Sequence, residues 1–371
     1  MNTSRLTRVL LPGLAIILFS GCNDDDAKPD LEPFRGTWTG ATEAEALGGT
    51  VQAPAHDGHE QGAAVLEMEV FEGRIRGTLI VQTTPGISPW VAAVSGNVSE
   101  DGLHLEDDYE QPIVAMDLTL NGDGHLGGTI ELPQTPDQSG TIALDRIPKG
   151  SVLATPIATY LQTDVSALAW DGQRLWVSTL GDDYILMSPN GQPEDTVAVF
   201  YVNDIHWNSN ALAFGNGRLW GFIPFTLSPG FSGIRILPFT RDGILFGGAF
   251  VLHMQTSGLA HDGDHLWSLN RAAGRIYQIS ETGDVTDSLA VEHLDTYHLE
   301  YARGHFWCLG WYLPKLYELD TEGRVLRVYD LPHDVANPAP EGLAYDGNAF
   351  YYARGQGGGS TIFRLTIEER D

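Results

Sequence analysis

An eleven-residue pattern that occurs five times constrains the fold of this chain more than any other feature. Its clearest copy is Ser257-Gly-Leu-Ala-His-Asp-Gly-Asp-His-Leu-Trp267. Every copy carries an aliphatic anchor at the same place, and these anchors are Leu168, Leu212, Leu259, Leu299 and Leu343. The period of about 44 residues is typical of propellers and solenoids, whose repeats each form one supersecondary unit. We therefore expect residues 150–371 to be built from like units.

Each repeat predicts four short antiparallel strands. The anchor leucine lies in the first strand, Asp-Gly or a substitute makes the turn, and an aromatic residue starts the second strand. Two more strands follow, separated by turns such as Asn190-Gly191 and Glu322-Gly323. Four strands in a unit of this length are typical of a propeller blade. The sequence thus predicts a five-bladed β-propeller, with six blades as the alternative.

The last repeat lacks a fourth strand, because Glu368-Glu-Arg-Asp371 is too short and too charged to form one. Residues 152–161, just before the first repeat, provide a spare strand. Pairing the two would close the ring and remove both open sheet edges. We therefore expect the propeller to be closed by its N-terminal strand.

The aromatic residue that ends each pattern is expected in the core between blades, because its place is the same in every blade. These residues are Trp176, Trp220, Trp267, Trp307 and Tyr351. His261 occupies a position at which the other repeats have an aromatic residue, so by the same argument we expect it to be a structural residue of the blade. Cys308, beside a blade tryptophan, is expected to be a small buried apolar residue.

Residues 34–148 predict a separate small β domain. About eight alternating segments are separated by turns such as Asp101-Gly102 and Asn121-Gly-Asp-Gly124, which favours an antiparallel barrel or sandwich. The opening Gly36-Thr-Trp-Thr-Gly40 and the closing Gly140-Thr-Ile-Ala-Leu-Asp-Arg146 resemble the lipocalin-like barrels of bacterial lipoproteins. The resemblance implies that Trp38 plugs one end of the barrel. Such a barrel holds one small apolar ligand or is filled by its own side chains, and we favour the filled barrel.

The N-terminal 22 residues predict an export signal. Arg5 and Arg8 precede an apolar run, and the small residues Ser20 and Gly21 precede Cys22. This arrangement resembles a bacterial lipoprotein signal, which implies lipidation of Cys22 and a membrane anchor; an ordinary signal peptide is the alternative. Residues 23–33 are acidic and contain proline, so we expect a solvated linker. The protein is then located in the cell envelope, on the periplasmic side or at the cell surface.

Charge and composition exclude some partners. The chain has 21 Lys and Arg against 49 Asp and Glu, a formal charge of −28, and no basic cluster interrupts this acidity. Such a surface repels phosphate backbones, so we expect no nucleic-acid partner. With only two cysteines, the fold must depend on its core and not on disulfides.

A cluster at residues 56–60, His-Asp-Gly-His-Glu, contains possible metal ligands. Its spacing matches no established zinc pattern, and polar residues are common in loops of this composition. We therefore expect no metal site, and no motif in the chain predicts a cofactor.

Ligand binding in a propeller is expected where loops converge over the central channel. Two sets of loops face that side: those that lead into the first strand of each blade, and those that join its second and third strands. From these loops we select ligand-binding candidates with aromatic, imidazole, guanidinium or carboxylate side chains. They are Asp182, Asp183, His206, Trp207, Arg271, Tyr297, His298, Trp311, Tyr312 and Arg354. For any one of them, an ordinary surface polar residue is the alternative.

The repeats resemble a broad group of propellers that includes the five-bladed glutamine cyclotransferases. The most similar stretch runs from Pro340-Glu-Gly-Leu-Ala to Gly-Gly-Ser360. In that family the acid before Gly-Leu is a proton shuttle, which implies a catalytic role for Glu341. The family's Glu-Ser-Thr-Gly stretch is replaced by Tyr352-Ala-Arg-Gly355.

Two functions follow from these observations. The first is a membrane-anchored extracytoplasmic lipoprotein whose propeller face binds a protein, peptide or glycan. The alternative is a glutamine cyclotransferase-like or lactonase-like enzyme in which Glu341 is the general acid or base, with His298 or Asp182 setting its pKa. No motif for a nucleophilic triad is present, so we favour binding.

Overall fold

The protein is all-β in the computed structural model. The structure describes residues 32–44, 60–71, 74–82, 90–99, 102–107, 114–131, 139–161, 164–179, 183–187, 190–198, 211–228, 231–244, 250–252, 254–291, 296–332, 340–355 and 359–368. Within them, the single 3-10 helix η1 (Glu32–Phe34) is one turn long, and no helix has the length and apolar character needed to cross a membrane. The export signal, Cys22 and the cluster at residues 56–59 lie outside the described residues.

Eight antiparallel strands close into a barrel in the N-terminal part of the chain. They are β1 (Gly36–Ala44), β2 (Glu60–Phe71), β3 (Arg74–Gln82), β4 (Trp90–Ser99), β5 (Gly102–Asp107), β6 (Ala115–Leu120), β7 (Leu126–Glu131) and β8 (Ser139–Arg146). Each strand pairs with the next along the chain, and β1 pairs with β8, with Trp38 opposite Arg146. Because every strand has two partners, the sheet has no free edge.

The interior of the barrel is lined by apolar side chains of alternating residues. In β5 and β6, for example, Leu103, Leu105, Met116 and Leu118 are buried while the residues between them are exposed or half-buried. These side chains belong to one continuous apolar cluster. Trp38 is 1% exposed within this cluster, and its Nε1 donates a hydrogen bond to the carbonyl of Phe34 at 3.1 Å.

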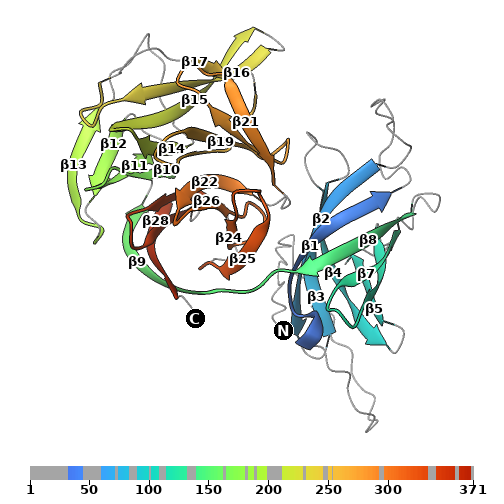
Figure 1. Ribbon diagram of the computed structural model, residues 1–371. Helices are drawn as coiled ribbons and strands as arrows, with labels where there is room; N and C mark the ends of the chain where they lie inside the picture. Colours follow the sequence, from blue (N-terminus) through green and yellow to red (C-terminus); the bar gives the residue numbers. More distant parts are fainter. Residues whose placement is uncertain are drawn as a thin grey trace, which may run out of the picture.

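Five sheets of four strands each follow the barrel. The first three are β10 (Val165–Trp170), β11 (Leu175–Thr179), β12 (Asp183–Met187) and β13 (Pro193–Ala198); β14 (Leu212–Gly215), β15 (Arg218–Ser228), β16 (Phe231–Phe239) and β17 (Phe250–Leu252); β18 (Gly258–His261), β19 (Leu266–Asn270), β20 (Arg275–Ile279) and β21 (Val285–Ala290). The fourth sheet is β22 (Tyr297–Ala302), β23 (His305–Leu309), β24 (Lys315–Leu319) and β25 (Val325–Asp330), and the fifth is β26 (Pro340–Tyr345), β27 (Phe350–Gly355), β28 (Gly359–Glu368) and β9 (Ser151–Leu161). Four-stranded sheets of this kind are propeller-like blades, so this part of the chain has a β-propeller fold (Figure 1).

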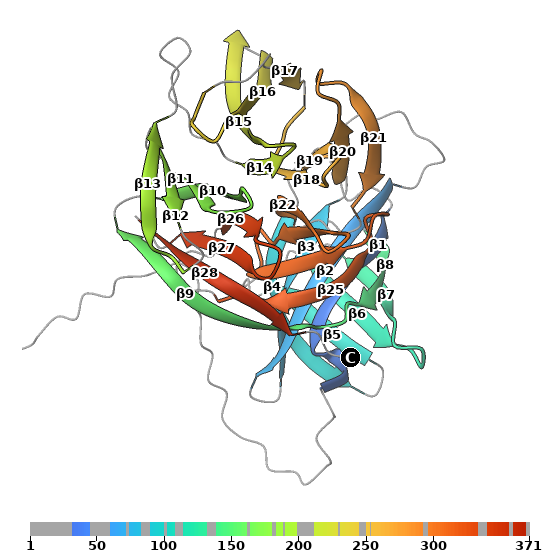
Figure 2. The same ribbon diagram turned by 60° about the vertical axis from the view of Figure 1, so that its left-hand side comes forward.

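The first and last strands of the propeller belong to the same blade. β9 pairs antiparallel with β28 along its length, from Ser151 opposite Glu368 to Leu161 opposite Gly359 (Figure 2). This is the pairing that the sequence predicts for residues 152–161. The inner strands β10, β14, β18, β22 and β26 lie against one another in this order, and β26 also lies against β10.

Where the repeated pattern contains Asp-Gly, its aspartate ties the turn to the blade core. In the third blade Asp262 accepts hydrogen bonds from the backbone N–H groups of Asp264 and His265 at 2.8 and 2.7 Å, and from Trp267 Nε1 at 2.7 Å. Asp171 makes the equivalent bonds in the first blade, including one from Trp176 Nε1 at 3.0 Å. In these two blades one carboxylate therefore accepts hydrogen bonds from both the turn and a buried indole, whereas in the fourth blade the Trp307 indole donates to the Ala302 carbonyl.

The pattern tryptophans lie between neighbouring blades, as predicted. Trp267 packs edge to face on Phe306 of the next blade, with ring centroids 5.1 Å apart. Trp307 packs on Phe350 of the blade that follows, at 4.6 Å and with tilted rings. Cys308 is fully buried among apolar side chains, as expected. Each blade thus depends on its neighbour to bury its largest side chain.

We predict that Asp262→Ala lowers the free energy of unfolding by about 1–3 kcal/mol, because it leaves the indole N–H of Trp267 without its acceptor. Asp264→Ala is the matched control, since Asp264 is exposed in the same turn. Chemical denaturation of both variants measures the difference. Equal destabilisation by the two substitutions would contradict this role for Asp262.

Candidate functional site

The sequence-predicted residues separate into two groups in the structure. Cys22, Asp182, His206 and Trp207 lie outside the described residues, and only the backbone of Asp183, the first residue of β12, is described. The others are Arg271, Tyr297, His298, Trp311, Tyr312, Glu341 and Arg354. Three of these were expected in loops but lie in strands, namely Tyr297 and His298 in β22 and Arg354 in β27, and Glu341 lies in β26. The difference arises because the strands continue further toward the loops than the pattern suggests.

Tyr297 and Glu341 occupy the same position in their blades, two residues before the anchor leucine. The inner strands run in the same direction in every blade, so their first residues gather at one end of the propeller. The candidate site is therefore the beginning of β22 and β26 together with the segments beside them. This is the end to which the sequence assigned the binding face.

The residue before the anchor leucine is small in four blades, because neighbouring inner strands approach closely there. A Cβ atom added to Gly258 would lie 2.6 Å from the carbonyl carbon of His298, and one added to Gly342 would lie 2.8 Å from the backbone nitrogen of Leu168. In the fourth blade this position is His298, which is 4% exposed and has a φ of 47°. A left-handed conformation is costly for a residue with a side chain and is enriched at functional sites.

His298 links the two blades of the candidate site. Its Nε2 donates a hydrogen bond to the carbonyl of Pro340, at 3.3 Å, immediately before Glu341. Burial lowers the pKa of His298 to about 4, although the bond to Pro340 acts in the opposite direction. The imidazole is therefore neutral at pH 7 and holds the start of β26 as a hydrogen-bond donor.

Glu341 is half-buried and lies among hydrogen-bonding groups. Ser360 of β28 donates its hydroxyl proton to Glu341 Oε2 and accepts a hydrogen bond from the backbone N–H of Val165 at 2.8 Å. Burial raises the pKa of Glu341 to about 7, the Ser360 hydrogen bond opposes this rise, and the nearby charge of Asp164 adds to it. A carboxyl group with this pKa exchanges protons at neutral pH, which suits a general acid or base. His298, which was expected to tune it, is not among these causes, and Asp182 lies outside the described residues.

Arg354 pairs across the sheet with Pro340, the residue before Glu341, and is buried instead of lying on the surface. It is 8% exposed, and its guanidinium carbon lies 5.4 Å from the centre of the Phe363 ring. Burial raises the pKa of Tyr352, the positive charge of Arg354 opposes the rise and the negative charge of Glu341 adds to it. Arg354 and Glu341 therefore both act on Tyr352 from nearby.

An aromatic platform lies next to His298; we use this name for Tyr297, Trp311 and Tyr312. The ring of Tyr297 is 4.4 Å from that of Trp311 and 4.7 Å from that of His298. The guanidinium carbon of Arg271 lies 5.3 Å from the Trp311 ring and 4.8 Å from the Tyr312 ring. All three aromatic residues are half-buried. Partly exposed rings beside a guanidinium group are a common ligand-binding arrangement.

Sequence reasoning missed three polar residues near this site: Ser360, Asp164 and Glu300. Glu300 lies in β22 at the position where the other blades have Ala169, Ala213, Ala260 and Ala344. Burial raises the pKa of Glu300 to about 8, and the backbone N–H groups of Tyr301 and Tyr345 oppose the rise. Alignment of the repeats contains the signal for Glu300, because a carboxyl group replaces a methyl group in one blade only.

The described residues contain no group of three or more His, Cys, Asp or Glu side chains arranged to hold a metal ion. Two neighbouring groups thus make up the candidate site: a protonatable carboxyl group at Glu341 and the aromatic platform with Arg271. The first suits proton transfer, and the second suits binding.

No protein-family model and no curated protein sequence matches the chain. Among solved structures, it is similar to the glutaminyl cyclase of Myxococcus xanthus, with 14% identity, a TM-score of 0.43, and coverage of 60% of this chain and 100% of the other. The WD40 propeller domain of Doa1 gives 13% identity, a TM-score of 0.34, and coverage of 73% of this chain and 88% of the other. A glucose dehydrogenase-type oxidoreductase from Thermus thermophilus gives 14% identity, a TM-score of 0.35, and coverage of 58% of this chain and 99% of the other. At these values the similarities say nothing about activity.

We predict that ionisation of Glu341 destabilises the fold between about pH 4.5 and about pH 7. The unfolded chain releases this proton near pH 4.5 and the folded chain near pH 7, so the folded state binds more protons between them and its stability falls as pH rises. Wild type should therefore lose more stability across this interval than Glu341→Gln, which cannot ionise. Chemical denaturation at a series of pH values measures both, and parallel curves would show that Glu341 has an ordinary pKa.

Proposed function

We propose that this protein is an extracytoplasmic lipoprotein with a lipocalin-like barrel and a five-bladed propeller. One end of the propeller binds a protein, peptide or glycan ligand. The order of contacts among the inner strands and the pairing of β9 with β28 support a closed ring of five blades. The residues before Cys22 support the lipid anchor, and the acidic residues 23–33 support a linker that holds the domains away from the membrane.

The aromatic platform is the observation that carries the binding proposal. Tyr297 and Trp311 come from different strands and loops of the fourth blade, and their rings lie 4.4 Å apart without being buried in the core. Rings of this kind supply large contact area and lose little side-chain entropy when a ligand binds. Arg271 adds a fixed cation that can pair with a carboxylate or a hydroxyl group of the ligand.

We predict that Trp311→Ala weakens ligand binding about 30-fold, because truncating an aromatic residue at the centre of an interface costs about 2 kcal/mol. A peptide and glycan array identifies the ligand, and titration then compares the variants. Phe71→Ala is the matched control: Phe71 is 45% exposed on the barrel and also lies under an arginine, Arg76, at 4.6 Å. Equal loss in both variants, or none in Trp311→Ala, would place the binding site elsewhere.

A second candidate function is an enzyme of the cyclotransferase or lactonase type. The observation that favours it is the raised pKa of Glu341, about 7, together with the hydroxyl group of Ser360 on the same carboxylate. A carboxyl group of this kind can give and take a proton during attack on a carbonyl group. Its neighbours Tyr352 and Arg354 differ from the residues expected in a cyclotransferase.

The enzyme candidate predicts turnover of N-terminal glutaminyl peptides or of lactones by the purified protein. Glu341→Gln keeps the size of the side chain and removes its proton transfer, so the rate should fall by a factor of about 100 or more. Product formation measured by mass gives the result. Absence of turnover in the wild-type protein would exclude the enzyme candidate. It would not contradict the proposal that the platform binds a ligand.

The lipid anchor predicts that Cys22→Ser moves the protein from the membrane fraction to the soluble fraction, because only a cysteine thiol accepts the diacylglyceryl group. Cys308→Ser is the matched control, since Cys308 is buried in the fourth blade. Fractionation of cells producing each variant, followed by mass measurement of the N-terminal peptide, tests this. Membrane association that persists in Cys22→Ser would refute the anchor.

A further inference from the structure

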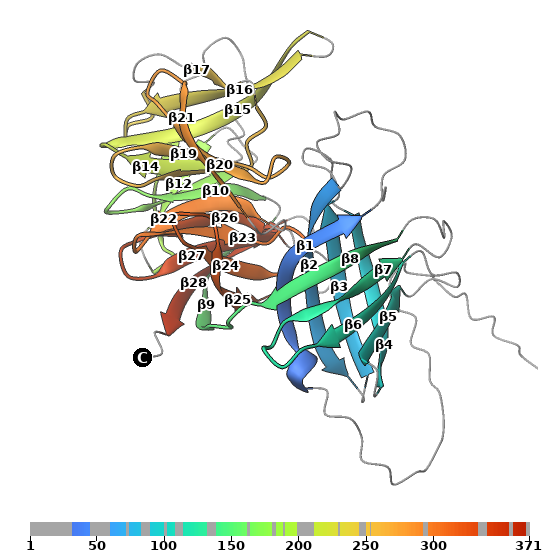
Figure 3. The same cartoon turned by 45° about the vertical axis from the view of Figure 1, so that its right-hand side comes forward.

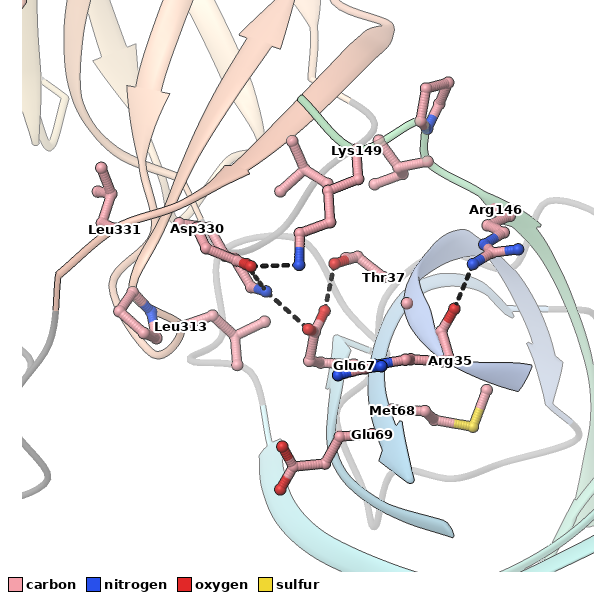
Figure 4. A pocket seen from close by; sticks show the side chains of 16 residues that line it. Arg35, Thr37, Glu67, Met68, Glu69, Arg146, Lys149, Leu313, Asp330 and Leu331 are labelled. Carbon is pink, nitrogen blue, oxygen red and sulfur yellow. Dashed lines mark hydrogen bonds and ion pairs between the residues drawn. The ribbon is translucent and has the colours of Figure 1, made fainter. Parts of the chain in front are cut away.

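A cleft of about 970 Å³ lies where the barrel meets the propeller (Figure 4). The barrel contributes the start of β1, part of β2 and the end of β8, and the propeller contributes residues of the β23–β24 loop and of β24 and β25. The segment 147–149, which connects the two domains, lines the cleft as well. Its volume lies at the upper end of the range for small-molecule sites, about 300–1,000 Å³, and such sites are common at domain interfaces.

A network of ion pairs joins the two domains along one wall of the cleft. Lys315 of β24 is 7% exposed, and its Nζ lies 2.6 Å from both Glu67 Oε1 of the barrel and Asp330 Oδ1 of β25. Thr37 donates a hydrogen bond to Glu67, and Lys149 pairs with Asp330. The two lysines and the two carboxylates therefore neutralise one another.

Apolar packing and backbone pairing hold the same two domains together beside the network. Leu313 is 6% exposed and packs against Val65 and Ile80 on the outer surface of the barrel. The connecting segment also pairs with β25, because the Gly150 N–H donates to the Val328 carbonyl at 2.8 Å and the Val328 N–H donates to the Pro148 carbonyl at 2.9 Å. Figure 3 shows the barrel beside β25. These contacts fix the walls, so the cleft exists before any ligand arrives.

Arg146 faces the cleft with most of its hydrogen-bonding capacity available. Its guanidinium carbon lies 6.0 Å from the centre of the Trp38 ring, and one of its nitrogens donates to the carbonyl of Arg35 at 2.6 Å (Figure 4). Among the described residues, no carboxylate forms an ion pair with Arg146. A guanidinium group has five N–H donors in a fixed fork, so the arrangement leaves donors for a ligand.

The charges of the cleft favour a singly charged anion. The charged residues that line the cleft are Arg35, Arg146, Lys149 and Lys315 against Glu67, Glu69 and Asp330, a net of +1 on a chain whose formal charge is −28. A carboxylate matches the fork of a guanidinium group and carries one charge. A phosphate carries nearly two negative charges at neutral pH, which is more than the net charge of the cleft balances. Apolar residues line the cleft beyond these charges, Ile147 and Leu313 among them.

We propose that the cleft between the barrel and the propeller binds a small amphiphilic carboxylate, whose carboxylate group pairs with Arg146 while its apolar body lies along Ile147 and Leu313. This site is separate from the platform in the fourth blade, and it does not depend on the function proposed for that face.

Titration calorimetry of the purified protein with sodium octanoate, at physiological ionic strength, tests the proposal. We expect saturable binding of one equivalent, at least tenfold weaker binding of acetate, which lacks the apolar body, and no binding of octyltrimethylammonium, which has the opposite charge. Arg146→Gln should weaken octanoate binding about tenfold to a hundredfold, because it removes a charged hydrogen-bond donor. Arg76→Gln is the matched control: Arg76 stacks on Phe71 of the barrel and does not line the cleft.

Arg146→Lys provides a second variant in case the glutamine variant does not fold, and circular dichroism checks both. Arg146→Lys keeps the positive charge and loses the planar fork of the guanidinium group. Octanoate binding that is weaker than in Arg76→Gln therefore supports the proposal. The proposal is overturned by any of three results: no saturable binding of octanoate, equal binding of octyltrimethylammonium, or unchanged octanoate affinity in a folded Arg146 variant.

Discussion

The ladder between β9 and β28 is the constraint on which the arrangement of the molecule depends. These strands are separated by almost the whole length of the propeller, yet they pair from Ser151 opposite Glu368 to Leu161 opposite Gly359. Without this ladder both strands would offer unpaired backbone groups to other chains. Because β9 is fixed in the last blade, the connecting segment must leave the propeller beside β25, and this determines where the barrel lies.

The candidate site is formed where the repeat pattern is broken. In most blades the positions around the anchor leucine hold small residues, which allow the inner strands to approach closely. The fourth blade has His298 and Glu300 there, and the fifth has Glu341 two residues before its leucine. Burying such groups is costly unless they are neutral or hydrogen-bonded. The low pKa of His298 and the high pKa of Glu300 keep these two groups largely uncharged at neutral pH, while Glu341, with a pKa of about 7, is protonated in about half of the molecules.

One short loop connects the binding platform with the interdomain cleft. Trp311 packs on Tyr297 in the propeller, while Leu313, two residues later, packs on the barrel. Lys315 then begins β24 and pairs with Glu67. Because the same five residues contact both regions, the barrel supports the loop that carries the platform as well as lining the cleft.

The amino-acid sequence by itself determined the all-β class, the four-stranded unit, the core position of the tryptophans and the pairing of residues 152–161 with the last strand. These features follow from the local periodicity of apolar residues and from the constant spacing of the repeat. Both can be read along the chain without knowing its fold. Only the tertiary structure decided that Ser360 and Asp164 lie beside Glu341, because they come from another strand and another blade. It also decided that Arg146 and Lys315 share a cleft, since that depends on how two domains pack. Such contacts are set by the arrangement of whole sheets, for which the spacing of residues along the chain carries no signal.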